Sequence, residues 1–120
     1  MEGQRMGSRP SSSASITGTP ASPGVATGRA RVMASSRQGS ALDPGDILVA
    51  VITDPLSFAD LIEHAAALVT DLGGLASHPA ILARELGIPC VVGTRIGTQA
   101  IPDGATVVVD GTAGTVDVVG

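Results

Sequence analysis

Aromatic residues and cysteine are nearly absent from this sequence. Phe58 is the only aromatic side chain, with no tyrosine or tryptophan beside it. The sequence therefore offers no stacked aromatic surface for single-stranded nucleic acid or sugars, and it implies an aliphatic core. Cys90 is the single cysteine, which excludes an internal disulfide and leaves too few soft ligands for a structural zinc site. This cysteine usage indicates a reducing compartment.

Positive charge and long apolar runs are also scarce. The formal net charge is −4, and no long cluster of lysine or arginine occurs. We expect neither a nucleic-acid partner nor binding to an anionic membrane, because both need a basic footprint. No segment approaches the roughly 18 apolar residues that span a bilayer, and the opening "MEGQRMGSRPSSSASITG" lacks the apolar stretch of a secretion signal. The expected location is the cytoplasm.

The length favours a single domain. A chain of 120 residues can bury one core but has little room for a second lobe. Residues 1–18 are rich in serine, glycine, arginine and proline, and their few apolar side chains cannot offset the entropy of ordering them. We predict a disordered tail over residues 1–18 and one folded domain over residues 19–120.

Three strands are predicted in the first part of this domain. An extended-looking run predicts a strand over residues 25–34, and the continuous apolar run "ILVAVI" predicts a buried strand over residues 47–52. Between them, "DPGD" has the chemistry of a turn. The segment "ALVTD" predicts another short buried strand over residues 67–71.

A helix is predicted between the second and third of these strands. Asp54 followed by Pro55 is typical of a helix start, although a capping box formed by Ser57 and Asp60 would move the start by two or three residues. Apolar residues then follow the helical spacing of one buried face: Phe58, Leu61, Ile62, Ala65 and Ala66. Strand, helix and strand together predict a parallel crossover unit.

Polar residues follow two strands of this unit, where functional loops usually lie. Thr53 and Asp54 come after the first strand, and residues 71–78 come after the second. We expect these two segments to lie close together.

His78 stands where a second helix is predicted to begin. Pro79 suits the first helical turn, and Gly87 followed by Pro89 provides a left-handed cap and a stop, which predicts a helix over residues 79–86. Free amide hydrogens and the helix dipole at such an N-terminus favour a bound phosphate and a neutral imidazole. A neutral imidazole has the lone pair that attacks phosphorus.

Small residues before His78 fit the same chemistry. Gly73 and Gly74 allow backbone amides to approach a transferred phosphoryl group. Ser77 has two interpretations, a helix cap or a hydrogen bond to a phosphoryl oxygen. Both glycines could equally form an ordinary turn, and His78 could itself be only a cap.

Other reactive side chains have simpler interpretations. His64 is expected on the surface of the first helix. Arg84 and Glu85 are expected on the solvated face of the second helix, and Cys90 is expected to pack as a small apolar residue.

The end of the chain predicts turns and a hairpin. Thr94 could cap a short helical turn that continues to Gln99, and "PDG" at residues 102–104 predicts a turn. The segment "TVVVDGTAGTVDVV", residues 106–119, predicts two strands joined by a glycine-containing hairpin. From spacing alone the fold class is mixed α/β.

Residues 69–94, "VTDLGGLASHPAILARELGIPCVVGT", resemble the signature of a known family. The family is the mobile, phosphohistidine-bearing swivelling domain of phosphoenolpyruvate (PEP)-utilising enzymes. Enzymes that contain such a domain include PEP synthase, pyruvate phosphate dikinase, enzyme I of the sugar phosphotransferase system and rifampin phosphotransferase. The resemblance extends over residues 19–119 and implies a compact swivelling β/β/α domain. It also implies that His78 is the phosphorylated residue, with Gly73, Gly74 and Ser77 as supports of the phosphate.

Two residues depart from the family pattern. Several members have threonine before the Ser-His pair, where this chain has Ala76, and Pro79 stands where small residues are common. The threonine hydroxyl is therefore missing, but the nucleophile remains. Thr53, Asp71 and Arg84 are further candidates for supporting positions around it.

The resemblance implies a phosphocarrier in a PEP-utilising or PEP-forming phosphotransferase. His78 would relay a phosphoryl group between nucleotide-binding and PEP- or pyruvate-binding domains on another chain. We expect no cofactor or metal in this domain, with Mg²⁺ held by those partners. The alternative is a non-catalytic interaction module that keeps the swivelling fold. A hydrolase using His78 as a general base lacks an evident nucleophile or metal partner.

Overall fold

The computed structural model describes residues 14–33, 42–52 and 61–120. Within these residues, eight strands form one sheet in the order β1-β8-β7-β3-β4-β5-β6-β2. The strands are β1 (Ala14–Thr17), β2 (Thr19–Ser22), β3 (Val25–Met33), β4 (Ile47–Ala50), β5 (Ala67–Thr70), β6 (Cys90–Val92), β7 (Thr106–Asp110) and β8 (Thr115–Val118). Two helices are α2 (His78–Leu86) and α3 (Gly97–Ala100), and residues 61–64 are also helical. None of the described helices is long and apolar enough to cross a membrane.

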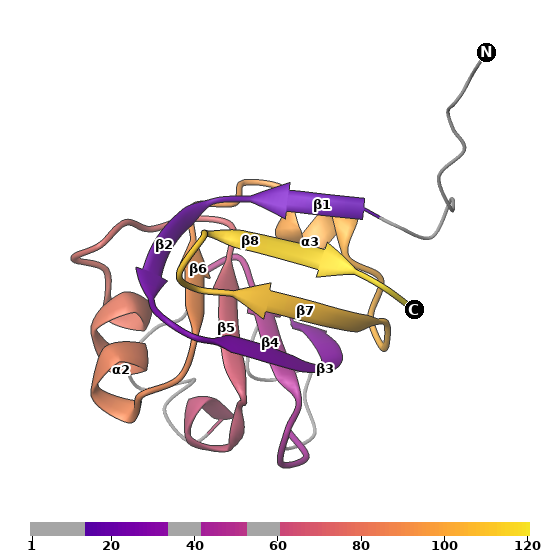
Figure 1. Cartoon of the computed structure of the whole chain (residues 1–120), viewed down its shortest axis with the longest axis horizontal. Coiled ribbons are helices and arrows are strands. Elements are labelled where there is room, and N and C mark those ends of the chain that lie inside the picture. The colour runs from indigo at the N-terminus through magenta and orange to yellow at the C-terminus, as the bar shows by residue number, and fades with distance from the viewer. Residues whose placement is uncertain (1–13, 34–41, 53–60) are drawn as a thin grey trace.

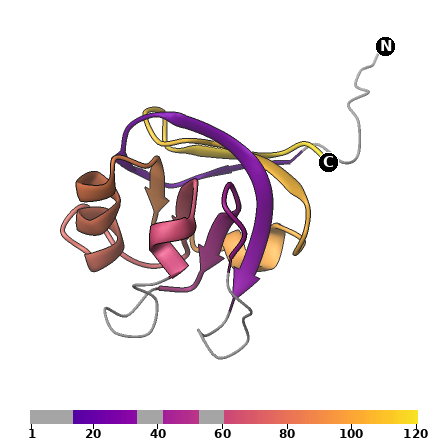
Figure 2. The ribbon, with the colours of Figure 1, turned by 90° about the horizontal axis from the view of Figure 1, so that it is seen from below.

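Two segments bend so that the sheet forms two layers (Figures 1 and 2). The first part of β3 pairs with β7 and its last part, from Ala30, pairs with β4. Strands β1 and β2 are separated by Gly18 alone, yet β1 pairs with β8 and β2 pairs with β6. A Cβ at Gly18 would lie 2.6 Å from the Val92 carbonyl oxygen. The close crossing at this bend therefore requires glycine.

Strand β1 corrects the predicted boundary of the tail. We predicted disorder over residues 1–18, but residues 14–17 form a strand paired with β8. The side chain of Ile16 is only 4% exposed and joins the core, whereas Ser15 and Thr17 face outward. One buried isoleucine is enough to order this strand when the edge of β8 supplies its backbone hydrogen-bond partners. The polar composition of the segment does not indicate this pairing.

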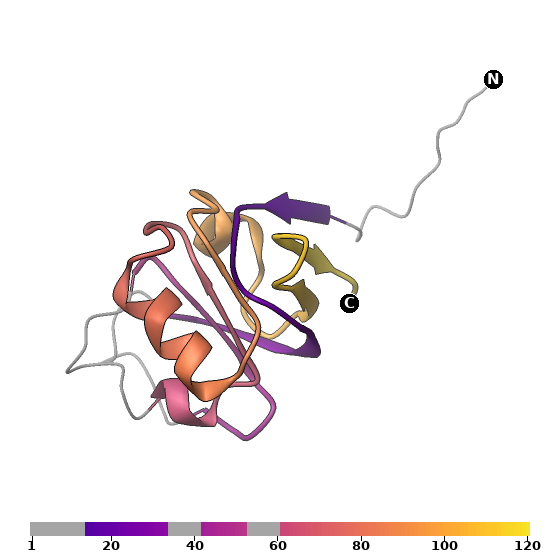
Figure 3. The same cartoon turned by 60° about the vertical axis from the view of Figure 1, so that its left-hand side comes forward.

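The parallel strands β4, β5 and β6 form the middle layer. Alternate residues such as Val49, Val69 and Val91 pack against the antiparallel strands β7 and β8. The residues between them, such as Leu48, Leu68 and Cys90, pack against α2 and the helical residues 61–64. Figure 3 shows both helical segments on the same side of these strands. This confirms the mixed α/β class and the β/β/α layering that the resemblance implied.

The elements predicted between residues 25 and 71 are present with some boundaries moved, whereas strands β2 and β6 were not predicted. Strands β4 and β5 are parallel, as the crossover unit required. Strand β4 ends at Ala50, two residues early, because Val51 and Ile52 are 38% and 43% exposed and do not continue the buried run. Residues 61–64 are helical, with Ile62 buried, while the predicted start at Asp54 lies outside the described residues.

The predicted turns and hairpin are also present. Asp46 N donates to Asp43 O at 3.0 Å, and Gly45 has a positive φ of 95°, which closes the "DPGD" turn. Strands β7 and β8 form the antiparallel hairpin. Thr94 was predicted to cap the next helical turn, but helix α3 has Ile96 as its N-cap, without a side-chain cap hydrogen bond. Thr94 Oγ1 instead accepts a hydrogen bond from Gly97 N, at 3.2 Å, just before the helix.

An ion-pair cluster fixes the "DPGD" turn to β3. Asp46 is buried, and its Oδ2 accepts hydrogen bonds from Arg29 Nη2 and Asp43 N, each at 3.1 Å. Arg31 Nη1 lies 3.5 Å from the same oxygen. Burial raises the pKa of Asp46, but the hydrogen bonds from Arg29 and Asp43 and the two arginine charges outweigh it, so the pKa is lower than usual.

We expect Asp46→Asn to lower the free energy of unfolding by about 1–2 kcal/mol at neutral pH. Arg29 is 48% exposed, so solvent screening keeps the effect below that of a fully buried pair. Because the pKa is lower in the folded state, the carboxylate stabilises the fold above the unfolded pKa of about 4, and this stabilisation disappears as the pH falls through the folded pKa. Chemical denaturation of both proteins across this range should show their difference shrinking in acid. A difference independent of pH would contradict the account.

Candidate functional site

The loop before His78 follows β5 at the edge where β4 also ends. Asp71 N donates to Ala50 O at 3.0 Å, and Leu72 N donates to Val51 O at 2.9 Å. The chain just after β4, at Val51, therefore meets the chain just after β5. Asp54, which belongs to the segment that we predicted near residues 71–78, lies outside the described residues. Thr53, which we predicted near the site, lies outside the described residues.

Helix α2 begins at His78, one residue before the predicted start. Ser77 is the N-cap, and the first helical hydrogen bond runs from Ile81 N to Ser77 O at 3.0 Å. The backbone amides of His78 and Ala80 precede that bond and so have no partner within the helix, whereas Pro79 has no amide hydrogen to offer. Gly87 ends the helix in the predicted left-handed conformation, with φ of 73°.

His78 is half-buried at this helix N-terminus. Its Nε2 atom is buried and has no hydrogen-bond partner in the described structure. A buried polar atom without a partner is unfavourable whether it carries a proton or a lone pair, so the fold gives Nε2 no evident structural role. An imidazole nitrogen that carries its lone pair can act as a nucleophile.

The predicted supports of the phosphate form a tight turn before the histidine. Both Ser77 N and Ser77 Oγ donate to Gly74 O, at 3.0 and 2.7 Å. The Ser77 side chain therefore does not cap the helix, and that prediction was wrong for its hydroxyl. Gly73 has a φ of 105°, and a Cβ there would lie 3.0 Å from Ser77 Oγ, so this glycine is needed for the turn. A Cβ at Gly74 would contact nothing within 4 Å.

Asp71 has a structural role in the described fold. The buried Asp71 carboxylate accepts hydrogen bonds from Thr98 N, at 2.9 Å, and from the Thr98 hydroxyl. It thereby joins the end of β5 to the start of α3. Both carboxylate oxygens of Asp71 are thus occupied by donors from Thr98. Asp71 therefore holds the loop in place and does not face a phosphate at the surface of the protein.

Arg84 is not simply part of a solvated helix face, as we had predicted. Its Nη1 donates to Ala21 O at 2.8 Å, and its Nη2 donates to Leu75 O at 2.6 Å. The guanidinium thus ties the loop before His78 to β2. No local sequence pattern indicates this contact, because the acceptors are backbone carbonyls 63 and 9 positions away.

The remaining candidates agree with their simpler interpretations. His64 is exposed, and Cys90 is buried. Burial raises the pKa of the Cys90 thiol to about 12, against a smaller lowering by the charge of Arg84. In the described ranges, no group of three or more His, Cys, Asp or Glu side chains could hold a metal ion.

Comparison with known sequences identifies a family. Residues 42–114 match the family model described as the mobile domain of PEP-utilising enzymes. The chain is 46% identical over 101 residues to a probable phosphoenolpyruvate synthase of Archaeoglobus fulgidus, which covers 84% of this chain and 13% of that protein. Identity is 46% over 101 residues to the phosphoenolpyruvate synthase of Pyrococcus furiosus and 45% over 104 residues to an uncharacterised phosphotransferase, YvkC, of Bacillus subtilis. The chain spans about 12% of the length of each of these two relatives.

Solved structures show the same likeness. A solution structure of Enzyme I superposes with a TM-score of 0.58 at 37% identity, over 64% of this chain and 32% of that one. Aconitase X of Thermococcus kodakaraensis superposes with a TM-score of 0.65 over 89% of this chain and 99% of the matched chain. The latter pair is only 19% identical, so that likeness concerns the fold alone.

Proposed function

Because this chain belongs to the family of mobile domains of PEP-utilising enzymes, we propose that it relays a phosphoryl group through a phosphohistidine at His78. The observation that carries the proposal is the position of His78. This residue begins helix α2, beside amides that have no partner within the helix, and its Nε2 atom is engaged by none of the described residues.

The chemistry requires two displacements at phosphorus. A ring nitrogen of His78 donates its lone pair to the phosphorus of the donor, and the bond from phosphorus to the leaving oxygen breaks. An oxygen of the acceptor then attacks the phosphohistidine, and the bond from phosphorus to nitrogen breaks. Because Nε2 is buried, attack through this nitrogen requires the imidazole to turn outward, and the amides of His78 and Ala80 would stabilise the resulting phosphate.

Donor and acceptor sites belong to partner domains in this proposal. The chain spans only about 13% of a relative named as a probable phosphoenolpyruvate synthase, so the rest of such a protein is available to supply nucleotide-binding and PEP- or pyruvate-binding sites. Mg²⁺ would be held there.

The fold also suits movement of His78 between two such sites. Ala14 of β1 pairs with Val118 of β8, so both ends of the domain lie together. Figure 1 shows them on the side opposite α2. Rotation about that corner would carry His78 through a wide arc.

The alternative is an interaction module that is never phosphorylated. Its specific support is the burial of Nε2, together with alanine at position 76, where the family resemblance implies threonine in several members. Such a module would dock on the same partners without accepting phosphate.

A relay assay in trans separates the two. The full chain is added to the Pyrococcus furiosus phosphoenolpyruvate synthase whose histidine matching His78 has been changed to glutamine, at a temperature where the chain stays folded. Transfer of label between radioactive pyruvate and PEP in the presence of Mg²⁺ is then followed. If the chain relays phosphate, it restores this exchange in proportion to its concentration. If the chain is only an interaction module, it restores no exchange.

A further inference from the structure

Arg95 is held in an unfavourable backbone conformation beside the loop that carries His78. Its φ is 71°, and within the described residues it is the only residue other than glycine with a positive φ. Arg95 N donates to Asp71 O at 2.8 Å, and Thr94 N donates to Thr70 O at 3.1 Å. These contacts fix the conformation, although glycine would adopt it with less strain. Strain maintained by its surroundings is concentrated at functional sites in proteins, so the Arg95 side chain merits a functional explanation.

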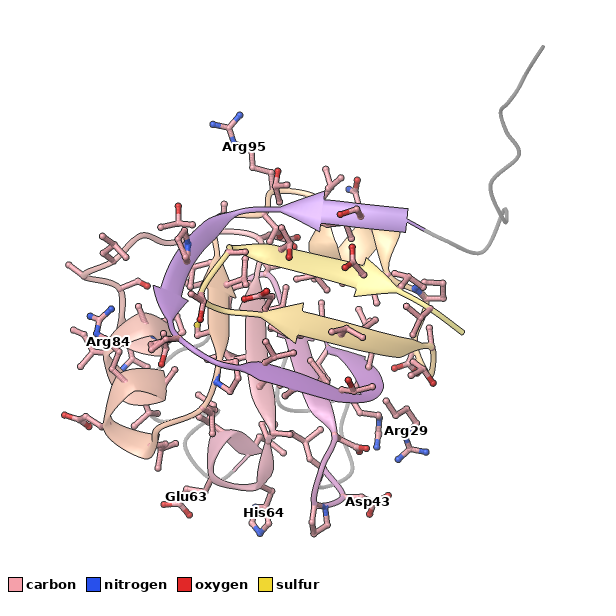
Figure 4. All side chains as sticks on the ribbon, viewed as in Figure 1. Arg29, Asp43, Glu63, His64, Arg84 and Arg95 are labelled. Carbon is pink, nitrogen blue, oxygen red and sulfur yellow. The ribbon has the colours of Figure 1, made fainter. Side chains whose placement is uncertain are left out.

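The guanidinium of Arg95 differs from the other described arginines in having no partner. Arg29 and Arg31 are paired with Asp46, and Arg84 donates to two backbone carbonyls. In residues 14–33, 42–52 and 61–120, no hydrogen bond or ion pair engages the Arg95 side chain, which is exposed. Figure 4 shows it extending away from the ribbon, far from the cluster that contains Arg29 and Asp43. Its charge is therefore available to another molecule.

Exposed apolar side chains lie on the loop that carries Arg95 and on the loop of residues 71–77. The loop of residues 71–77 packs on the following loop so closely that Gly73 O lies 3.0 Å from where a Cβ would stand at Gly93. Three large apolar side chains on these two loops are about half exposed: Leu72 (52%), Leu75 (56%) and Ile96 (49%). We call Leu72, Leu75, Arg95 and Ile96 the docking face.

Resting on the proposed function, we propose that Arg95 is the charged docking residue of this face and pairs with a carboxylate on the partner domain that exchanges phosphate with His78. Its planar guanidinium can hold a carboxylate through two hydrogen bonds, which fixes orientation as well as position. The apolar side chains of the docking face would be covered in the same contact. Arg95 is thus a positioning residue that aligns His78 with the partner's site.

A protein carboxylate fits the geometry better than a free phosphate. Figure 4 shows the Arg95 side chain directed outward from the ribbon. The backbone bond to Asp71 O fixes the base of this side chain to the first residue of the His78 loop. A cation so placed can orient one protein on another, and among the described residues no other side chain bonds with the guanidinium to enclose a small anion.

The test measures the full chain as phosphoryl acceptor from the Pyrococcus furiosus enzyme variant described above. Arg95→Gln removes the charge, Arg95→Lys keeps it, and Arg95→Gly removes both the charge and the backbone strain. Arg29→Gln is the matched control, because it removes an exposed arginine charge at a distant edge. Binding of each unphosphorylated chain to the same enzyme is measured by titration calorimetry at low and high salt.

We expect Arg95→Gln and Arg95→Gly to raise KM and Kd about tenfold at low salt, with kcat changed less than about twofold. Arg95→Lys should bring KM and Kd part of the way back to the wild-type values, and Arg29→Gln should leave both unchanged. High salt should reduce the difference in Kd between each Arg95 variant and the wild type. Arg95→Gly should also unfold at a higher temperature, which separates the docking defect from folding. Equal KM and Kd for wild type and Arg95→Gln would overturn the proposal, as would a loss confined to kcat.

Two further outcomes distinguish the possible failures. If inorganic phosphate alone shifts the NMR signals of the wild-type docking face and not those of Arg95→Gln, Arg95 binds a small anion and the docking proposal is wrong. If wild type binds the enzyme through Arg95 but gains no phosphate, docking is supported and the proposed relay through His78 fails.

Discussion

His78→Gln is expected to abolish the exchange of label between pyruvate and PEP in the relay assay, reducing it at least about a thousandfold. Glutamine can fill a similar position at the start of α2 but has no nitrogen lone pair able to attack phosphorus. Thermal unfolding of His78→Gln should stay close to that of the wild type, because Nε2 makes no hydrogen bond with the part of the chain that the structure describes.

His64→Gln is the matched control for this loss. His64 is the other histidine of the chain, and it is exposed on the helical residues 61–64. We expect this variant to support exchange at the wild-type rate. Equal loss in both variants, or substantial exchange by His78→Gln, would show that His78 is not the carrier.

Gly111→Ala should lower the free energy of unfolding by at least about 3 kcal/mol. A Cβ at Gly111 would overlap the Ser22 carbonyl oxygen and lie 2.9 Å from Cys90 N. Both are backbone atoms, so neither can move aside as a flexible side chain would. Gly111 N also donates to Gly24 O at 2.7 Å, which holds the β7–β8 turn against the end of β2. Since small domains are stable by about 5–15 kcal/mol, the variant should lose a large part of its stability.

Gly74→Ala provides the comparison for Gly111→Ala in chemical denaturation. Nothing lies within 4 Å of a Cβ at Gly74, and its φ is not positive. We expect a change within about 0.5 kcal/mol of the wild type. Similar free energies of unfolding for the two variants would mean that the close backbone contacts at Gly111 do not require glycine.

Local chemistry made most of the elements predictable. The apolar runs at residues 47–52 and 67–71 and the proline and glycine around α2 each act through neighbouring residues, and the strands, helix and cap formed where expected. The bend at Gly18 and the pairing of β1 with β8 depend on residues about a hundred positions apart. No local pattern encodes such a pairing, so the tail boundary was misplaced.

The candidate site was predictable in part for the same reason. Gly73 and the helix start at His78 are local features of one loop and could be predicted from the sequence. The roles of Asp71 and Arg84 depend on Thr98, Ala21 and Leu75, which only the fold brings together. Arg95 had no sequence signal, because its positive φ and unpaired charge are properties of the folded loop.

The most direct test of the account is the intact mass of the full chain after incubation with PEP, Mg²⁺ and the Pyrococcus furiosus enzyme variant. The account predicts a gain of one phosphate that is lost in acid, survives alkali and is absent in His78→Gln. The positive control is the wild-type enzyme, which must phosphorylate its own mobile domain under the same conditions. If it does and this chain gains no phosphate, the claim that His78 is a phosphocarrier is contradicted.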